Sequence, residues 1–320
     1  MAATDTGSMT DFEMATEPLR GELVAYCYRM LGSWADAEDA VQDALLRAWR
    51  AWDRFEQRSS VRTWLYRITT NVSLTALEGR SRRALPSVLG TSEPDEPERL
   101  PADMWVQPYA ASRDDVRLAL VAGLQTLSPA QRAVWLLREV LAFPAAEVGE
   151  MLDLSIAAVK SSLQRARAQL KDADLQPDDV VEPDASEARR YLDAYVTAFQ
   201  NADVDLLIEV LRADIKLEIL PGRRWFDGLG ECAPVFRAAM GEPGDWRMDP
   251  TMANGQPAVA AYLNGGPYGL AVLDIRRDGI AAVTVFDDPE LAVRFSRARL
   301  RSPGHDQSGQ ADGTPKPDVL

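Results

Sequence analysis

Three blocks with different hydrophobic patterns follow one another along this chain. In the first two blocks apolar residues recur with the spacing of one face of an α-helix, and in the third they form short runs typical of strands. Acidic segments rich in proline separate the blocks. This order predicts a multidomain protein in which two all-α domains are followed by an α+β domain.

The length of the chain agrees with this division. A chain of 320 residues, 46% of them apolar, suffices for two or three domains that each bury a core. Residues 104–109, MWVQPY, are too apolar for an inert linker, and we expect them to dock on a folded part of the protein. The expected divisions are a disordered N-terminus over 1–11, helical domains over 12–83 and 113–171, linkers over 84–112 and 172–185, an α+β domain over 186–300 and a disordered tail over 301–320.

The scarcity of histidine and cysteine excludes several kinds of chemistry. The single histidine, His305, lies in the expected tail, so we expect no histidine base, no Ser/His/Asp triad and no histidine-ligated metal. Cys27 and Cys232 are too far apart in the chain to form a disulfide framework or a zinc site on their own. The sequence shows neither a signal peptide nor an apolar run of membrane-spanning length, so we expect a cytoplasmic protein without cofactor or membrane partner.

The net charge of −14 argues at first against nucleic-acid binding, but the charge is unevenly distributed. Residues 1–171 hold 20 basic and 23 acidic residues, whereas residues 172–320 hold 15 and 26. Within the first half, residues 54–83 hold seven arginines against two acidic residues, and residues 154–171 hold four cations and no acid. These segments predict two separate contacts with a polyanion, and two merely solvated helix faces are the alternative.

Local signals predict where the helices begin. Ser33 is the expected N-cap of a helix with an apolar side over residues 37–52, and a further helix is expected over 60–77. Ser128, followed by Pro and then Gln at the third helical position, is a strong helix start. A short helix over 145–152 and a second helix over 156–171, capped by Ser155 and basic on its outer face, together predict a helix-turn-helix.

The third block has a different pattern. It predicts helices over residues 188–199 and 204–212 that precede a meander of strands, and therefore an α+β domain with a curved antiparallel sheet. The expected strands are 215–220, 223–226, 246–251, 258–263, 269–275 and 280–286.

Two segments of the helical blocks resemble one known family. Residues 36–49, DAEDAVQDALLRAW, with residues 61–72, VRTWLYRITTNV, resemble regions 2.2 to 2.4 of bacterial extracytoplasmic-function (ECF) sigma factors, and the segment from Leu127 to Arg167 is similar to their region 4. The resemblance covers most of residues 12–171 and implies an alternative sigma factor that binds core RNA polymerase, recognises the −35 and −10 promoter elements and initiates transcription. A helix-turn-helix regulator that acts without polymerase is the alternative.

The resemblance also implies which residues contact the partners. The last helix of the helix-turn-helix enters the major groove of the −35 element, although Arg165 has the alternative role of holding its two helices together. The helix expected over 60–77 holds the melted −10 strand, by stacking on bases and by arginine contacts with phosphates, although Trp64 is alternatively a core residue. The implied −35 residues are Ser155, Lys160, Ser161, Gln164, Arg165 and Arg167, and the implied −10 residues are Arg62, Trp64, Arg67, Thr70 and Asn71.

An acidic helix face is a poor surface for DNA. By resemblance it meets the basic clamp helices of the polymerase β′ subunit, with the β flap as a further polymerase contact, and a merely solvated face is the alternative. The residues of this face are Asp36, Glu38, Asp39, Gln42 and Asp43.

The C-terminal block, about residues 186–298, resembles the SnoaL-like members of the NTF2-like superfamily, as found in the SigG-like group of ECF sigma factors. This implies a bent sheet around a conical pocket that could take a small molecule. The acidic residues Asp205, Asp214, Glu218 and Asp227 show no spacing typical of acid/base partners, and Asp205 is more simply a helix cap, so we expect a regulatory module and not an enzyme. The pocket candidates, which are alternatively plain core, are Tyr191, Tyr195, Phe199, Trp225, Trp246 and Tyr262.

Overall fold

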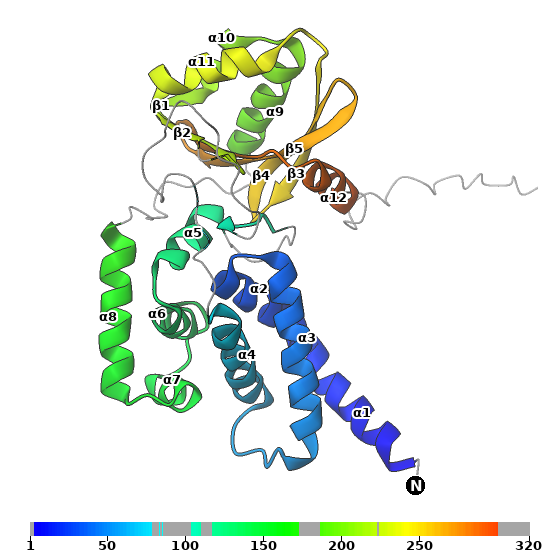
Figure 1. Cartoon of the computed structure of the whole chain (residues 1–320), viewed down its shortest axis with the longest axis vertical. Helices are drawn as coiled ribbons and strands as arrows, with labels where there is room; N and C mark the ends of the chain where they lie inside the picture. The colour runs from blue at the N-terminus through cyan, green and yellow to red at the C-terminus, as the bar shows by residue number, and fades with distance from the viewer. Residues whose placement is uncertain are drawn as a thin grey trace, which may run out of the picture.

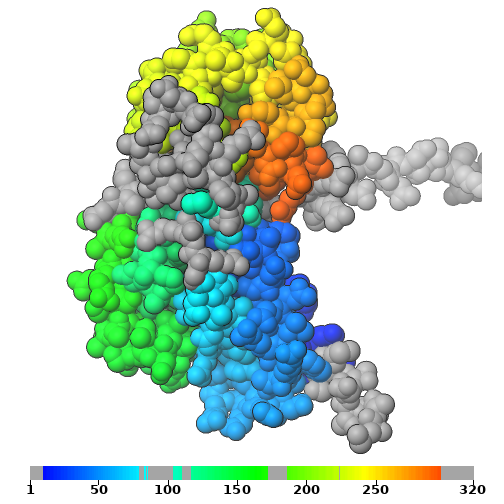
Figure 2. Space-filling view, in the orientation of Figure 1, coloured from blue at the N-terminus to red at the C-terminus, as the bar shows by residue number. Residues whose placement is uncertain are grey.

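The computed structural model describes residues 3–78, 83, 85, 104–109, 117–172, 186–222 and 224–299. Two helical units lie side by side, and an α+β domain sits on one end of both of them (Figures 1 and 2). The expected sequence of two all-α parts and one α+β part is therefore confirmed. The expected linker over 172–185 lies outside the described residues except for Asp172, as does the expected disordered tail over 301–320.

The first helical unit is built around a helix that is buried on nearly all sides. Helix α2 buries every residue from Ala25 to Leu31, so the other helices of the unit pack around it. Serine side chains cap the two following helices: the Ser33 hydroxyl, as predicted, accepts from the Asp36 amide at 3.3 Å, and the Ser60 hydroxyl, at the expected helix start, accepts from the Thr63 amide at 3.0 Å. The helices are α1 (Ala3–Thr16), α2 (Arg20–Leu31), α3 (Trp34–Ala51) and α4 (Val61–Leu77).

The N-terminus differs from the expectation of disorder over residues 1–11. Helix α1 begins at Ala3 and is anchored near its C-terminal end, where Phe12 packs edge-on against Trp49 and Trp52 with ring centroids 5.3 Å from each. Aromatic pairs of this geometry are favourable beyond the area they bury. Phe12 falls within the domain expected from residue 12, so this contact agrees with that start, whereas the helix itself extends further back to Ala3.

The second helical unit contains the predicted helix-turn-helix. The Ser128 and Gln131 side chains form a reciprocal capping box, which defines the start of α6. Between α7 and α8 the chain turns through Asp153 in a left-handed conformation with φ of 56°. A Cβ on Gly149 would lie 2.6 Å from the Leu154 carbonyl oxygen, so this tight turn requires glycine there. The helices are α5 (Leu118–Thr126), α6 (Pro129–Trp135), α7 (Ala145–Leu152) and α8 (Ile156–Asp172), with a single π-helical turn over Leu136–Val140.

The α+β domain contains one six-stranded sheet in the order β2-β1-β6-β5-β4-β3. Its strands pair antiparallel as expected, except that β1 and β6 run parallel. The helix expected to end at 212 ends at Val210, and Asp203, not Asp205, caps it by accepting from the Leu206 amide at 3.0 Å. The elements are α9 (Ser186–Asn201), α10 (Val204–Val210), β1 (Leu211–Leu220), β2 (Arg224–Asp227), α11 (Leu229–Met240), β3 (Trp246–Ala253), β4 (Gln256–Leu263), β5 (Gly266–Arg276), β6 (Gly279–Phe286) and α12 (Pro289–Arg299).

The two faces of the sheet belong to different cores. Helices α9 and α11 cover one face and form with it a core that belongs to the domain alone. Side chains of the other face, together with α12, join the same continuous core as the two helical units. The α+β domain therefore packs against the helical units and shares a core with them (Figure 1).

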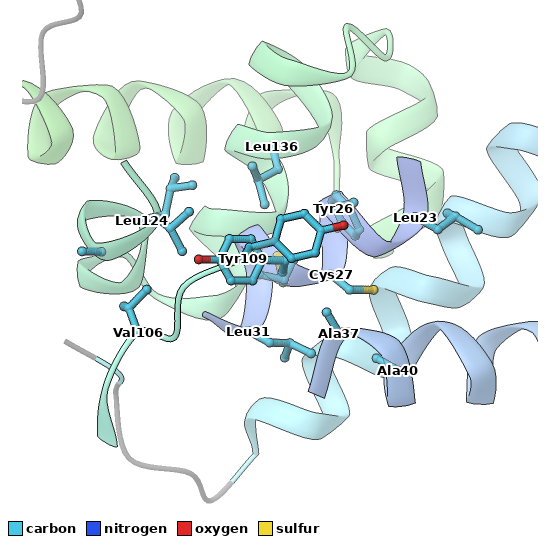
Figure 3. Close-up of a cluster of buried hydrophobic side chains, with 14 of the residues drawn as sticks. Leu23, Tyr26, Cys27, Leu31, Ala37, Ala40, Val106, Tyr109, Leu124 and Leu136 are labelled. Atoms are coloured by element: carbon cyan, nitrogen blue, oxygen red, sulfur yellow. The ribbon is translucent and has the colours of Figure 1, made fainter. Parts of the chain in front are cut away.

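The apolar hexapeptide over residues 104–109 docks as predicted. Trp105, Val106 and Tyr109 are all buried, and Figure 3 shows Val106 and Tyr109 among side chains from both helical units. The Gln107 amide donates to the Gly32 carbonyl at 2.9 Å, at the corner between α2 and α3. The segment therefore binds the first helical unit through both apolar contacts and backbone hydrogen bonds.

Candidate nucleic-acid and polymerase interface

Helix α8 separates its polar and apolar sides as a DNA-reading helix must. Val159, Leu163 and Ala166 are buried against the preceding helices, so the opposite side projects from the protein. The exposed side chains include every residue predicted for −35 contact: Ser155, Lys160, Ser161, Gln164, Arg165 and Arg167. A helix with this arrangement can place amide, hydroxyl and cationic groups against base edges and phosphates.

Two arginines of α8 also have contacts within the protein. Arg167 forms an ion pair with Glu139 at 2.8 Å, although its side chain stays 60% exposed. Arg165 lines a shallow surface hollow together with Ser128 and Gln131 at the start of α6. This position puts Arg165 beside the start of α6, and its alternative role, holding the two helices of the helix-turn-helix together, stays a prediction.

On α4 the predicted −10 residues divide into two groups. Arg67 and Asn71 are exposed and free to meet a strand of DNA. Trp64 is half-buried, with its ring stacked on Phe55 at 4.7 Å and tilted against Trp52 at 6.0 Å. The core interpretation thus accounts for much of the Trp64 side chain.

Two other predicted −10 residues are engaged inside the protein. Thr70 is completely buried: its hydroxyl pairs with the Tyr26 hydroxyl at 2.8 Å and donates to the Tyr66 carbonyl at 2.6 Å. We therefore remove Thr70 from the DNA-contacting set. The Arg62 side chain is 36% exposed and forms an ion pair with Glu22 at 3.2 Å, so in this arrangement its guanidinium already has an acidic partner within the protein. Sequence periodicity could not reveal either contact, because both partners come from α2.

The acidic face of α3 is present, but its five predicted residues are not equally available to a partner. Glu38, Asp39 and Gln42 are exposed. The other two predicted residues are partly neutralised, since Asp43 pairs with Arg47 and Asp36 pairs with Arg83, each at 2.8 Å. The three exposed residues therefore carry most of the polar surface that this helix offers a partner.

Sequence reasoning did not single out Leu46 on the same helix. Its side chain is 49% exposed, one turn beyond Gln42. A signal was present, because this leucine falls outside the apolar side formed by Val41, Ala44 and Ala48. A large apolar side chain next to carboxylates fits a partner that brings both cations and apolar stems, as lysine- and arginine-rich helices do.

Helix α12 of the α+β domain reaches the start of this face. The Arg294 guanidinium lies over the Trp34 ring, 4.0 Å from its centroid. Partial burial raises the pKa of the Glu38 carboxyl above its ordinary value, and the charge of Arg294 opposes that shift. The same Glu38 charge is felt by Arg294, whose pKa burial lowers. The domain thus influences the electrostatics of the α3 surface.

We expect Glu38→Gln to raise thermal stability at neutral pH. Because folding raises this pKa, the ionised carboxyl lowers the stability of the folded protein. This destabilisation is complete above the folded pKa and absent below the ordinary pKa of about 4.3. Melting temperatures of both proteins at pH 7 and pH 5 check this, and the difference should shrink at the lower pH. A variant less stable than the natural protein at pH 7 would contradict it.

Asp39→Asn removes the same charge from the same face. Comparing its affinity for a basic partner with that of Glu38→Gln tests whether the affinity depends on charge alone.

The pocket candidates do not converge on one cavity. The Phe199 ring packs on both Tyr195 and Trp246, with ring centroids 4.9 Å from Tyr195 and 5.9 Å from Trp246. Tyr191 joins the same core. Tyr262 lies on the other face of the sheet, where its hydroxyl reaches Ser296 of α12 at 2.9 Å.

Trp225 does not belong to this aromatic core either. Its neighbour Phe226 packs into the core beneath α9 and α11, and successive side chains of a strand point to opposite faces. The prediction was wrong for Tyr262 because side chains alternate along β4: Ala261 joins the core beneath α9 and α11, so Tyr262 lies on the opposite face. The core interpretation, which the sequence left open, accounts for the remaining four residues.

A buried polar junction joins the parts of the protein. The Asn254 side chain, in the turn between β3 and β4, donates to the Tyr28 hydroxyl at 2.7 Å and accepts from the Tyr109 amide at 2.9 Å. The Asn254 amide in turn donates to the Tyr109 carbonyl at 2.7 Å. Beside it, the Gln256 side chain accepts from the Leu118 amide at 2.8 Å. We call these contacts the Asn254 junction; they connect α2, the hexapeptide and α5 to one β-hairpin.

An acidic helix face, an exposed reading helix in a helix-turn-helix and a second arginine-bearing helical unit together define a sigma factor, the subunit that brings RNA polymerase to promoter DNA. Family models agree: sigma-70 region 2 matches residues 16–83 and sigma-70 region 4 matches residues 117–170. RNA polymerase and promoter DNA are therefore the partners of this protein. Among the described residues, none of the helices has the length and apolar character needed to cross a bilayer.

The chain belongs to the ECF RNA polymerase sigma factors. It is 43% identical over 310 residues to the ECF sigma factor SigG of Mycobacterium tuberculosis, a match that covers 89% of this chain and 83% of that protein. The probable ECF sigma factor SigI of the same species is 28% identical, covering 84% and 91%. The crystal structure of M. tuberculosis SigJ superposes with a TM-score of 0.56 at 23% identity, covering 86% of this chain and 95% of that one, and thus shares the fold.

Proposed function

We propose that this sigma factor carries its own regulator: the α+β domain controls how region 2 (residues 16–83) and region 4 (residues 117–170) meet polymerase and DNA. The Asn254 junction supports this most directly. Its hairpin contacts region 2 at Tyr28, the linker at Tyr109 and the first turn of region 4 at Leu118. A domain that holds all three at once can bias their arrangement.

A catalytic role has less support. Two of the acidic residues singled out in the sequence lie apart from the aromatic core: Asp214 and Asp227 are both exposed, and Asp214 pairs with Arg212 at 2.8 Å. That hydrogen bond holds the pKa of Asp214 below its ordinary value, which suits an ion pair and not a general acid. We therefore propose a non-catalytic module, with cytoplasmic polymerase as its target.

The finer assignments of the interface are part of the same proposal. Region 4 reads the −35 element with Lys160, Ser161, Gln164 and Arg165, and Ser155 and Arg167 bind phosphates. In region 2, Arg67 and Asn71 contact the −10 strand from the exposed side of α4. The exposed α3 residues Glu38, Asp39 and Gln42, with Leu46 beside them, meet the clamp helices of the β′ subunit. Exposure and charge support each assignment.

Transcription in vitro tests the regulatory role. Core polymerase is given either the full chain or a version ending at residue 176, with a library of randomised promoters as template and sequencing of the transcripts as readout. We expect the two proteins to differ in total output or in affinity for core polymerase by at least about tenfold, which is the scale of a typical coupling between domains. Equal output and equal affinity would refute regulation by the domain.

The same experiment addresses the second candidate function, a helix-turn-helix regulator that binds a small molecule. Such a protein would bind duplex DNA by itself and would add nothing to core polymerase. The region 2 and region 4 matches favour the sigma factor. Transcripts that begin only when both polymerase and this protein are present would exclude the alternative.

A further inference from the structure

The carbonyl end of α2 is bonded by groups from outside the helix. The last carbonyls of a helix have no partner within it, and cations near that end are favourable. Here the Arg29 carbonyl accepts from the Gln125 side chain at 3.1 Å, the Met30 carbonyl accepts from the Arg132 guanidinium, and the Leu31 carbonyl accepts from Arg83 at 2.7 Å. Gln125 and Arg132 both belong to region 4. Region 4 therefore completes a helix of region 2.

Arg132 depends on this contact as much as α2 does. Its side chain is only 3% exposed, and the same guanidinium also bonds Gln125 and the Leu127 carbonyl. A buried guanidinium is costly unless its donors are satisfied. If region 4 moved away, the Met30 carbonyl and one donor of Arg132 would both lose their partner.

The same arrangement covers the first turns of α4. The Thr63 hydroxyl donates to Glu147 of α7 at 3.2 Å. Next to it, the Arg62 guanidinium lies 4.8 Å from the centroid of the Phe143 ring, and that ring packs edge-on against Tyr66 at 5.3 Å. Region 4 therefore covers part of Arg62, one of the cations predicted for the −10 strand, whose side chain stays 36% exposed.

Promoter geometry is incompatible with this packing. The −35 and −10 elements lie about 25 base pairs apart by their names, and at a rise of about 3.4 Å per pair this is roughly 80 Å of duplex. Region 4 and α4 instead touch at Thr63 and Glu147. The two regions must separate before both elements can be bound at once.

We propose that Arg132 and Gln125 latch region 4 onto the carbonyl end of α2, so that the free sigma factor is closed and the start of α4 is partly covered until core polymerase separates the two regions. This latch lies between regions 2 and 4 themselves. It goes beyond regulation by the α+β domain, and its test needs neither a promoter nor removal of that domain.

The experiment measures the distance between the two regions in the full chain. Cysteines replace two exposed residues, Thr75 on α4 and Ala168 on α8, and carry spin labels. The native Cys27 and Cys232 are buried, and burial raises the pKa of their thiols to about 12 and about 11, so they should stay unlabelled. The second readout is the association rate with core polymerase.

We expect the natural protein to show one short, narrow distance and Arg132→Ala to add a population at longer distance. Losing hydrogen bonds to a charged group shifts such an equilibrium by about tenfold to a hundredfold, and association with core polymerase should accelerate by at least about tenfold. Gln169→Ala is the matched control, since the Gln169 side chain bonds the Thr126 carbonyl within region 4 and has no contact with region 2 among the described hydrogen bonds. It should leave both readouts unchanged.

A second pair of variants covers the case in which Arg132→Ala fails to fold. Glu147→Arg removes the acceptor of the Thr63 hydroxyl and places a large cation at this contact, so it should open the protein, whereas Glu150→Arg, on the exposed side of the same helix, should not. A broad or long distance in the natural protein overturns the proposal. So does a Glu147→Arg protein whose distance and association rate match those of Glu150→Arg.

Discussion

Alanine at both Lys160 and Gln164 should abolish most promoter-specific transcription while leaving affinity for core polymerase unchanged. Both side chains are exposed on the reading side of α8, and each base contact of this kind contributes about 1–3 kcal/mol of discrimination. Losing two corresponds to a fall in output of at least about thirtyfold at a preferred promoter. Sequencing of transcripts from a randomised promoter library measures both the fall and the lost preference at −35 positions.

The matched control for this double variant is Gln169→Ala. Gln169 is an exposed glutamine on the same helix, but its side chain donates to the Thr126 carbonyl at 3.0 Å and so belongs to the packing of region 4. It should retain the −35 preference. If the Lys160 and Gln164 double variant kept the natural preference, the assignment of this helix side to base reading would be wrong.

Asn254→Ala should loosen the α+β domain from the sigma regions. The substitution removes the acceptor of the buried Tyr109 amide and one of the two partners of the Tyr28 hydroxyl, which also bonds the Gln107 carbonyl; a buried group that loses its partner costs about 1–3 kcal/mol. The expected result is a lower melting temperature and rapid proteolytic cleavage in the linker around residues 104–109, measured by calorimetry and limited proteolysis. Under the proposed regulatory function, transcription output should change in the same direction as on removal of the domain.

Asn264→Ala is an unusually close control for this variant. Asn254 and Asn264 occupy equivalent turns before glycine, with φ of 56° and 51°, so alanine introduces the same backbone strain at both positions. Asn264 is exposed and takes no part in the junction. Equal protease resistance in the two variants would show that the Asn254 side chain does not hold the domain in place.

The sequence predicted most of the local structure because its signals are local. The capping serines Ser33, Ser60 and Ser128 all act within one helical turn, and each begins a helix in the structure as expected. The polar side of α8 likewise follows from a period of 3.6 residues, so the exposed −35 candidates could be named in advance.

Other features depend on contacts between distant segments. Helical periodicity places Thr70 on α4, but its burial depends on the Tyr26 hydroxyl of another helix. Alternation along β4 puts Tyr262 on one face of the sheet, but only the fold shows that α12 covers that face and contacts the Tyr262 hydroxyl. Arg132 looks in the sequence like one more cation of a DNA-binding unit, yet the structure buries it against the carbonyl end of α2.

The sequence alone thus determined the order of the domains, the helix-turn-helix and the charge of each surface, because composition, capping and periodicity act over a few residues. Only the tertiary structure decided which polar groups form hydrogen bonds inside the protein and which stay exposed for partners. The physical reason is that a buried donor or acceptor must find a partner in the fold, and for Asn254, Arg132 and Arg62 that partner lies in another region of the chain.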